Sequence, residues 1–218
     1  MKKSKLFIFA SILITITLIS CGETDANESI ENPLPIYGQK EFIEGIDKDT
    51  VYHTIPFWSF ENQDGQHVGS KDYMGKPYIA YFFFSHCPQI CPRLNANMKQ
   101  FQDDTKDLDY RVVAYTVDPT RDSVERLKFY AEEYGFNLTN YNFVTGSQTS
   151  IYELGVNGYL VPNSQDALAP GGFLHSEKLI LIDSKGRIRG FYEGTENAEV
   201  ELLKKDLKTL ISHESNSK

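Results

Sequence analysis

The chain has 218 residues, and its hydrophobic content of 40% and charged content of 24% are typical of a globular protein with an apolar core. Its formal net charge is −8, and no basic stripe with interleaved aromatic residues occurs, which argues against a nucleic-acid partner. The chain contains three cysteines, Cys21, Cys87 and Cys91, and these are the only thiols available for redox or metal chemistry.

The first 20 residues have the pattern of an export signal. Lysines cluster within residues 1–5, and an apolar run over residues 6–19 follows, which is short for a membrane span. We expect residues 1–20 to be a signal peptide. The segment that ends at Cys21 resembles a bacterial lipobox, which implies a lipidated Cys21 that anchors the exported protein to a bacterial membrane. The alternative is an uncleaved anchor helix, which also tethers the protein outside the cytoplasm.

The remainder of the chain is expected to form one tether and one domain. Residues 21–49 are polar, acidic and poor in large apolar side chains, so we expect a flexible tether there. Residues 50–213 contain no second linker and no internal repeat, which predicts a single folded domain. Because an exported protein meets oxidising conditions, Cys87 and Cys91 can cycle between a disulfide and two thiols.

A buried strand leads directly into the cysteine pair. Residues 78–84 are a continuous apolar run without charge, which indicates a strand buried on both faces at the centre of a parallel sheet. After Cys87 and Cys91, apolar residues recur at helical spacing, which predicts a helix. The helical positions are Leu94, Met98 and Phe101.

The position of the cysteines at a strand–helix junction predicts reactive thiols. The positive end of a helix dipole stabilises a thiolate and lowers its pKa, and Pro88 suits the first helical turn. A spacing of four residues places Cys87 and Cys91 on one helical face, where they can form a disulfide or bind one ion. The alternative is a pair of buried thiols that only pack.

Alternating strands and helices continue along the chain. Residues 111–117 predict a second buried strand that ends at Asp118, and Ser123 or Asp122 is expected to cap a helix that stops at Gly135. Residues 142–145 predict a third strand. The apolar side of the helix that stops at Gly135 is expected to comprise Val124, Leu127, Phe129, Tyr130 and Tyr134.

The segments at both ends of the domain predict hairpins. Residues 55–61 and 66–68 flank a turn at Asp64-Gly65, and residues 173–183 and 187–192 flank a turn at Gly186. A final helix is expected from Thr195.

Two segments lie between the third strand and the second hairpin. Residues 147–154 predict a short helix that ends at Gly155, and residues 156–172 are expected to be a long loop. The element order predicts an α/β fold with a central mixed sheet flanked by helices and extended by an N-terminal hairpin. In such sheets the functional crevice lies beyond the carboxyl ends of the parallel strands, where Cys87 and Asp118 both fall.

A histidine near the cysteines would change the chemistry that this crevice supports. Two cysteines alone make a redox pair, whereas thiolates with an imidazole suit copper. His86 is adjacent to Cys87, but neighbours on an extended segment point to opposite sides, so it is either a modulator of the thiol or a surface residue. His175 begins a strand after the long loop, where it is either a third ligand or a packed or solvated residue. The five candidates are His53, His67, His86, His175 and His213.

Three ordered motifs resemble the SCO/SenC family of thioredoxin-like proteins, over about residues 57–210. They read HCPQICP, TVDPTRDSVE and LHSEKLILIDSKGRI. The resemblance implies a thioredoxin-like fold and a metallochaperone that delivers copper during assembly of the binuclear copper centre of cytochrome c oxidase, with the oxidase subunit that holds this centre as its partner.

The resemblance also implies roles for individual residues. Cys87 and Cys91 match the copper thiolates, and His175 matches the imidazole ligand. Asp118 matches an aspartate that either supports the site or serves as a turn or capping residue. This chain departs from many relatives at Gln89, where they carry an acidic residue, and at Leu174, where they carry aspartate.

Two functions of different classes follow. The first is a membrane-tethered copper metallochaperone. The second is a thiol–disulfide oxidoreductase in which Cys87 attacks, Cys91 resolves the mixed disulfide, and no metal takes part. A thiol peroxidase needs a single activated cysteine, which the cysteine pair disfavours. The first two functions are compatible, because a dithiol must be reduced before it binds copper.

Overall fold

A computed structural model describes residues 34–42, 50–88, 90–166 and 170–216, without the side chains of residues 41, 42, 50, 170, 174 and 175. The expected signal peptide, Cys21 and Gln89 therefore lie outside the described residues. Residues Asn32–Lys218 form one compact unit. Among the described residues, no helix has both the length and the apolar character that crossing a membrane requires.

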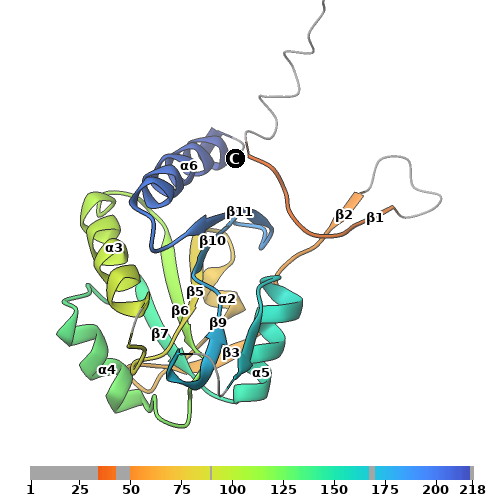
Figure 1. The fold of residues 1–218 in the computed structure, drawn as a ribbon. Helices are drawn as coiled ribbons and strands as arrows, with labels where there is room; N and C mark the ends of the chain where they lie inside the picture. Colours follow the sequence, from red (N-terminus) through yellow and green to blue (C-terminus); the bar gives the residue numbers. More distant parts are fainter. Residues whose placement is uncertain (1–33, 43–49, 89, 167–169, 217–218) are drawn as a thin grey trace, which may run out of the picture. The chain divides into compact units, whose positions relative to one another are not determined.

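A seven-stranded mixed sheet, in the order β11-β10-β5-β6-β7-β3-β4, forms the centre of this unit (Figure 1). The neighbouring strands β5, β6 and β7 are parallel, and the other pairs are antiparallel. The mixed α/β sheet expected from the element order is therefore confirmed. The strands are β3 (Ser59–Asn62), β4 (His67–Gly69), β5 (Tyr78–Phe83), β6 (Arg111–Thr116), β7 (Tyr141–Thr145), β10 (Lys178–Ile182) and β11 (Ile188–Glu193).

Helices flank the sheet, and α3, α4 and α6 lie on the opposite side from α5 (Figure 1). Every residue of β5 is buried, as expected for a central strand. Successive side chains of β5 point to opposite faces of the sheet. The Phe83 ring packs on Tyr130 of α4, and the Phe82 ring packs on Tyr115 and Tyr159. The helices are α2 (Ser70–Tyr73), α3 (Ile90–Asp104), α4 (Val124–Glu133), α5 (Gln148–Glu153) and α6 (Asn197–Asn216).

Strand pairing begins earlier than the boundary expected at residue 50. A separate antiparallel pair, β1 (Lys40–Phe42) and β2 (Thr50–Tyr52), starts within the stretch expected as a tether. Still earlier, the Leu34 and Pro35 carbonyls accept hydrogen bonds from the buried Arg189 guanidinium.

The hairpin of β3 and β4 turns at Gly65, which has a φ of +71°, as the Asp64-Gly65 signal predicts. Its first strand starts at Ser59 rather than at residue 55. Pro56 has no N–H to donate to a ladder, which explains the later start.

The expected helix stop at Gly155 is wrong. The chain continues from α5 into a π-helix, η1 (Leu154–Gly158). A Cβ at Gly155 would lie 1.8 Å from Nδ2 of Asn163, so this glycine permits a close approach instead of ending a helix. In α4 the Ser123 cap and the Gly135 stop are confirmed, but Phe129 is exposed and lies beneath the Arg126 guanidinium.

The long loop expected over residues 156–172 is also wrong in part, because β8 (Asn163–Gln165) lies within it and pairs antiparallel with β9 (Phe173–His175). The single strand expected over residues 173–183 is therefore two strands, β9 and β10. The Ser176 hydroxyl accepts a hydrogen bond from the Lys178 N–H at 3.1 Å, which forms a turn between the strands. Consequently His175 ends a strand rather than beginning one.

Candidate functional site

The two cysteines lie where the chain leaves the carboxyl end of β5 and enters α3. Cys87 is in the preceding turn and donates its N–H to the Phe84 carbonyl at 3.3 Å, whereas Cys91 is in the first helical turn. Both residues are buried thiols that form a hydrogen bond with each other and no disulfide. Because α3 begins at Ile90, Pro92 rather than Pro88 occupies its first turn.

The expected fall in thiol pKa is wrong for Cys91. The hydrogen bond with Cys87 raises the pKa of Cys91 well above its usual range, and burial raises it further. These effects outweigh the helix N-terminus. Cys91 is therefore a protonated thiol at neutral pH, and a metal ion must displace its proton to bind.

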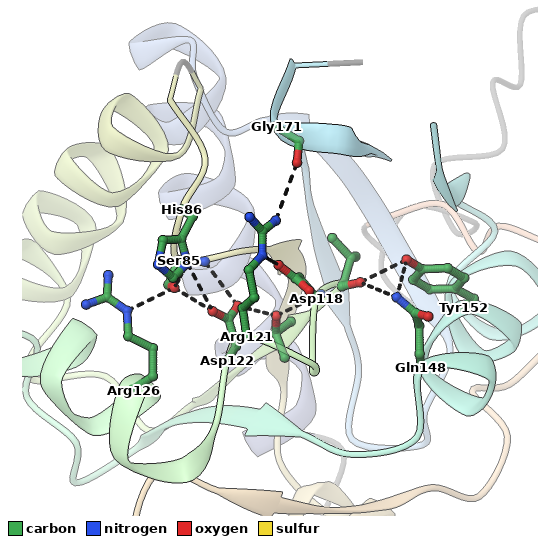
Figure 2. Close-up of polar contacts among 11 residues, drawn as sticks. Ser85, His86, Asp118, Arg121, Asp122, Arg126, Gln148, Tyr152 and Gly171 are labelled. Atoms are coloured by element: carbon green, nitrogen blue, oxygen red, sulfur yellow. Dashed lines mark hydrogen bonds and ion pairs between the residues drawn. The ribbon is translucent and has the colours of Figure 1, made fainter. Parts of the chain in front are cut away.

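A buried carboxylate, Asp122, holds the turn that precedes Cys87 (Figure 2). Its Oδ2 accepts hydrogen bonds from the Ser85 N–H at 3.0 Å and the Thr116 hydroxyl at 2.5 Å, and its Oδ1 accepts one from the Ser85 hydroxyl at 2.5 Å. Arg126 Nε donates to the same Ser85 hydroxyl at 3.0 Å. This network joins the ends of β5 and β6 to the start of α4 and thereby positions the chain just before Cys87.

Asp118 and Arg121 connect the turn after β6 to the segment that leads to His175, through the Gly171 carbonyl (Figure 2). The Asp118 carboxylate is almost fully buried and forms an ion pair with Arg121 Nε. The same guanidinium donates to the Gly171 carbonyl at 3.4 Å and lies 5.6 Å from the centre of the Phe173 ring. The backbone carbonyl of Asp118 accepts hydrogen bonds from the N–H groups of residues 121 and 122, so Asp118 is both a turn residue and a support for this link.

The backbone that leads to His175 packs directly on the end of β5. The Phe173 ring lies 5.1 Å from the Phe84 ring, centroid to centroid. A Cβ at Gly171, where φ is +76°, would lie 2.7 Å from the Phe84 ring and 3.4 Å from Pro88. The segment before His175 therefore sits against the residues on both sides of the turn that contains Cys87. The His175 side chain lies outside the described part of the structure.

The other histidines have different surroundings. His86 is half exposed, and its Nδ1 lies 2.9 Å from the Ser85 hydroxyl and 3.9 Å from Oδ1 of Asp122. The His53 ring contacts the Gly158 carbonyl, and His67 lies near Glu61. Among the side chains that the structure describes, no three His, Cys, Asp or Glu residues are grouped closely enough to hold a metal ion.

Two residues that organise this site are not predicted from the sequence. The sequence pattern offers Asp122 only as a helix cap, whereas Ser123 is the cap and Asp122 faces the turn before Cys87. The sequence motifs assign no role to Arg121. Both follow the carboxyl end of a parallel strand, which is where an α/β sheet places functional groups, and that position was the available signal.

The chain is similar to proteins of known family. Residues 47–212 match the family model described as SCO1/SenC. A curated relative, the SCO1 protein homolog of Bacillus subtilis (strain 168), is 29% identical over 169 residues, which is 74% of this chain and 85% of the relative. The match covers only 28% of the length of the mitochondrial SCO1 homolog 1 of Arabidopsis thaliana.

Three solved structures share the fold. A SCO1/SenC family lipoprotein from Bacillus anthracis str. Ames is 31% identical, with a TM-score of 0.67 over 72% of this chain and 95% of that chain. BsSco, described as a member of the Sco family of cytochrome c oxidase assembly proteins with a disulfide switch, is 28% identical, with a TM-score of 0.67 over 76% of this chain and 97% of that chain. Arabidopsis thaliana ScoI with copper bound is 28% identical, with a TM-score of 0.61 over 72% and 97%.

The thioredoxin-like fold implied by the sequence motifs is thus confirmed, and the family match spans most of the domain. This chain belongs to the SCO1/SenC family.

Proposed function

We propose that this protein is a copper carrier that acts during assembly of the binuclear copper centre of cytochrome c oxidase. In this proposal copper is bound by the thiolates of Cys87 and Cys91 and the imidazole of His175. One observation carries it: the backbone that ends at His175 rests on Phe84 and Pro88, beside the turn that contains Cys87. The copper-bound Arabidopsis relative and the oxidase-assembly family of BsSco support it.

The donor set suits the metal. Two thiols within hydrogen-bond reach of each other offer soft ligands, and an imidazole suits either oxidation state of copper. Burial of both sulfurs keeps water away from the ion. Because binding requires both thiolates, copper must displace the protons of the two thiols, and loading is expected to release protons. Asp118 takes part indirectly, by holding the Arg121 side chain that contacts the β9 segment.

In this function the protein is anchored to a membrane. Removal of residues 1–20 and lipidation of Cys21 would leave residues 50–213 as a copper domain tethered to the outer face of a bacterial membrane. The lipobox-like sequence supports this, as does the description of the Bacillus anthracis relative as a lipoprotein. The partner is the oxidase subunit that receives the copper.

A copper titration tests the ligand set. The reduced protein is titrated with copper under anaerobic conditions and desalted, beside the variants His175→Ala and Cys91→Ser. We expect the wild type to retain copper in a one-to-one ratio, and both variants to lose most of it on desalting. Failure of the reduced wild type to retain copper would contradict the copper-carrier function.

The hydrogen-bonded thiols favour a second function, thiol–disulfide exchange. A Cys87 thiolate would attack a substrate disulfide and release one substrate thiolate, and deprotonated Cys91 would then attack Cys87 to release the second. The two electrons pass to the substrate, and the new Cys87–Cys91 disulfide must be reduced by an external dithiol. His175→Ala would leave this reaction nearly unchanged while weakening copper binding, so the two functions are separable in one variant.

A further inference from the structure

Asn163 is an unusual buried side chain. It is 6% exposed, and both of its amide atoms, Oδ1 and Nδ2, are buried without a hydrogen-bond partner among the described residues. Buried polar groups in folded proteins almost always have partners, so an amide that lacks both of its bonds calls for an explanation.

The backbone next to the Asn163 amide allows an unusually close approach. The π-helix η1 brings Gly155 against Asn163, and a Cβ at Gly155 would lie 1.8 Å from Nδ2 and 3.2 Å from the Phe82 ring. Any larger residue at position 155 would therefore displace the amide. Single π-helical turns occur frequently at functional sites, which fits a role for the group that this turn accommodates.

The strand register places Asn163 directly opposite His175. The Asp166 N–H donates to the Gly172 carbonyl, and the alternation of an antiparallel ladder then makes 163 and 175 a non-hydrogen-bonded pair. Opposing Cα atoms of such pairs approach to about 4.5 Å, and paired residues share one face of the ribbon. Phe173 occupies the same face, two positions before 175, and packs on Phe84 at the end of β5.

From this juxtaposition we infer that Asn163 is the positioning residue for His175. Its amide oxygen accepts the N–H of one imidazole nitrogen, which fixes the tautomer and leaves the other nitrogen as a ligand. Histidine ligands commonly donate their second ring N–H to a polar acceptor, and Oδ1 of Asn163 is a buried acceptor that no other described residue occupies. The inference rests on the proposed role of His175 in copper binding.

Nuclear magnetic resonance of the metal-free, reduced protein tests the inference without copper. Long-range correlations between ring nitrogens and ring protons report the tautomer of His175. We expect one dominant tautomer in the wild type and in Asn163→Asp, which keeps an acceptor oxygen, and a mixture in Asn163→Leu. Ser164→Ala, on the opposite face of the ribbon, is the matched control and should behave as wild type. An unchanged tautomer in Asn163→Leu would overturn the inference.

Copper affinity and stability provide a second test. Competition with a chelator should show a loss of about 10- to 100-fold in affinity for Asn163→Leu. In a His175→Ala background the same substitution should change affinity by less than about twofold, because a residue that acts through His175 has no effect without it. The thermal midpoint of metal-free Asn163→Leu should stay within about 3 °C of that of the wild type, because loss of the hydrogen bond to the imidazole is offset by removal of the buried Nδ2, which has no partner among the described residues.

The results of these experiments distinguish failure of the copper function from failure of the positioning role of Asn163. If the wild type binds no copper but the tautomer depends on Asn163, the copper function fails and the positioning role stands. If Asn163→Leu lowers copper affinity equally with and without His175, or lowers the thermal midpoint by more than about 3 °C, Asn163 is a packing residue and the inference is wrong. If Asn163→Leu does not fold, Asn163→Ala provides the same comparison.

Discussion

Substitution of Asp122 by alanine should be among the most destabilising single changes near the cysteines. The carboxylate is fully buried and accepts three hydrogen bonds, two from Ser85 and one from Thr116. Hydrogen bonds to a charged group contribute about 1.5–3 kcal/mol each, and their losses are not additive when one group makes all three. We therefore expect Asp122→Ala to lower the free energy of unfolding by about 3–5 kcal/mol, which corresponds to a fall of roughly 6–20 °C in the thermal midpoint.

Thermal and chemical unfolding of the reduced protein provide the measurement. Asp122→Asn keeps one acceptor oxygen and should lose less than half as much stability as Asp122→Ala. The control is Asp109→Ala, which removes an exposed ion pair with Lys76 and should cost less than about 1 kcal/mol. If Asp122→Ala unfolds at the same temperature as the control, the argument that this carboxylate holds the turn before Cys87 is wrong.

Three further predictions concern the same part of the molecule. Folding raises the pKa of Cys91, so the folded state retains a proton that the unfolded chain releases above about pH 8.5. The contribution of Cys91 to the free energy of unfolding should therefore be fully present below that pH. Above it, the free energy of unfolding should fall by up to about 1.4 kcal/mol per pH unit. Cys91→Ala should reduce this slope in unfolding titrations between about pH 8 and 9, below the range in which the buried tyrosines, whose pKa values folding also raises, begin to contribute. Arg121→Met should lower the free energy of unfolding by about 1–3 kcal/mol, because it leaves the buried Asp118 carboxylate without its ion pair. It should also increase amide hydrogen exchange in β8 and β9, because it releases the Gly171 carbonyl and the Phe173 ring. Gly155→Ala should destabilise the protein by about 1–3 kcal/mol in denaturant unfolding, and less so when Asn163 is also alanine.

Each of these predictions has a result that would contradict it. A slope between about pH 8 and 9 that is unchanged in Cys91→Ala would assign the titration to another group. Unchanged exchange in Arg121→Met would mean that the aromatic contact between Phe173 and Phe84 alone holds β9. A Gly155→Ala variant as stable as the wild type would show that the Asn163 side chain can move aside at no cost.

Local sequence patterns were sufficient to predict the main strands of the sheet. The uncharged run over residues 78–84 forms a strand buried on both faces, and the Asp64-Gly65 and Ser123 signals mark a real turn and a real cap. The strand follows from its continuous hydrophobic run, the turn from the φ preference of glycine, and the cap from one side-chain hydrogen bond. Residues close together in the sequence determine each of these features. The cysteine pair was placed correctly at the end of β5 for the same reason.

Only the tertiary structure decided the features that depend on residues far apart in the chain. The pKa of Cys91 rises instead of falling because its surroundings combine burial with a partner thiol, which outweighs the local helix terminus. The strand β8 within residues 156–172 could not be predicted, because it is a strand only through its pairing with β9. Asp122 and Arg121 likewise gain their importance from Ser85 and Gly171, because a hydrogen bond across some 40 or 50 residues leaves no periodic trace in the sequence.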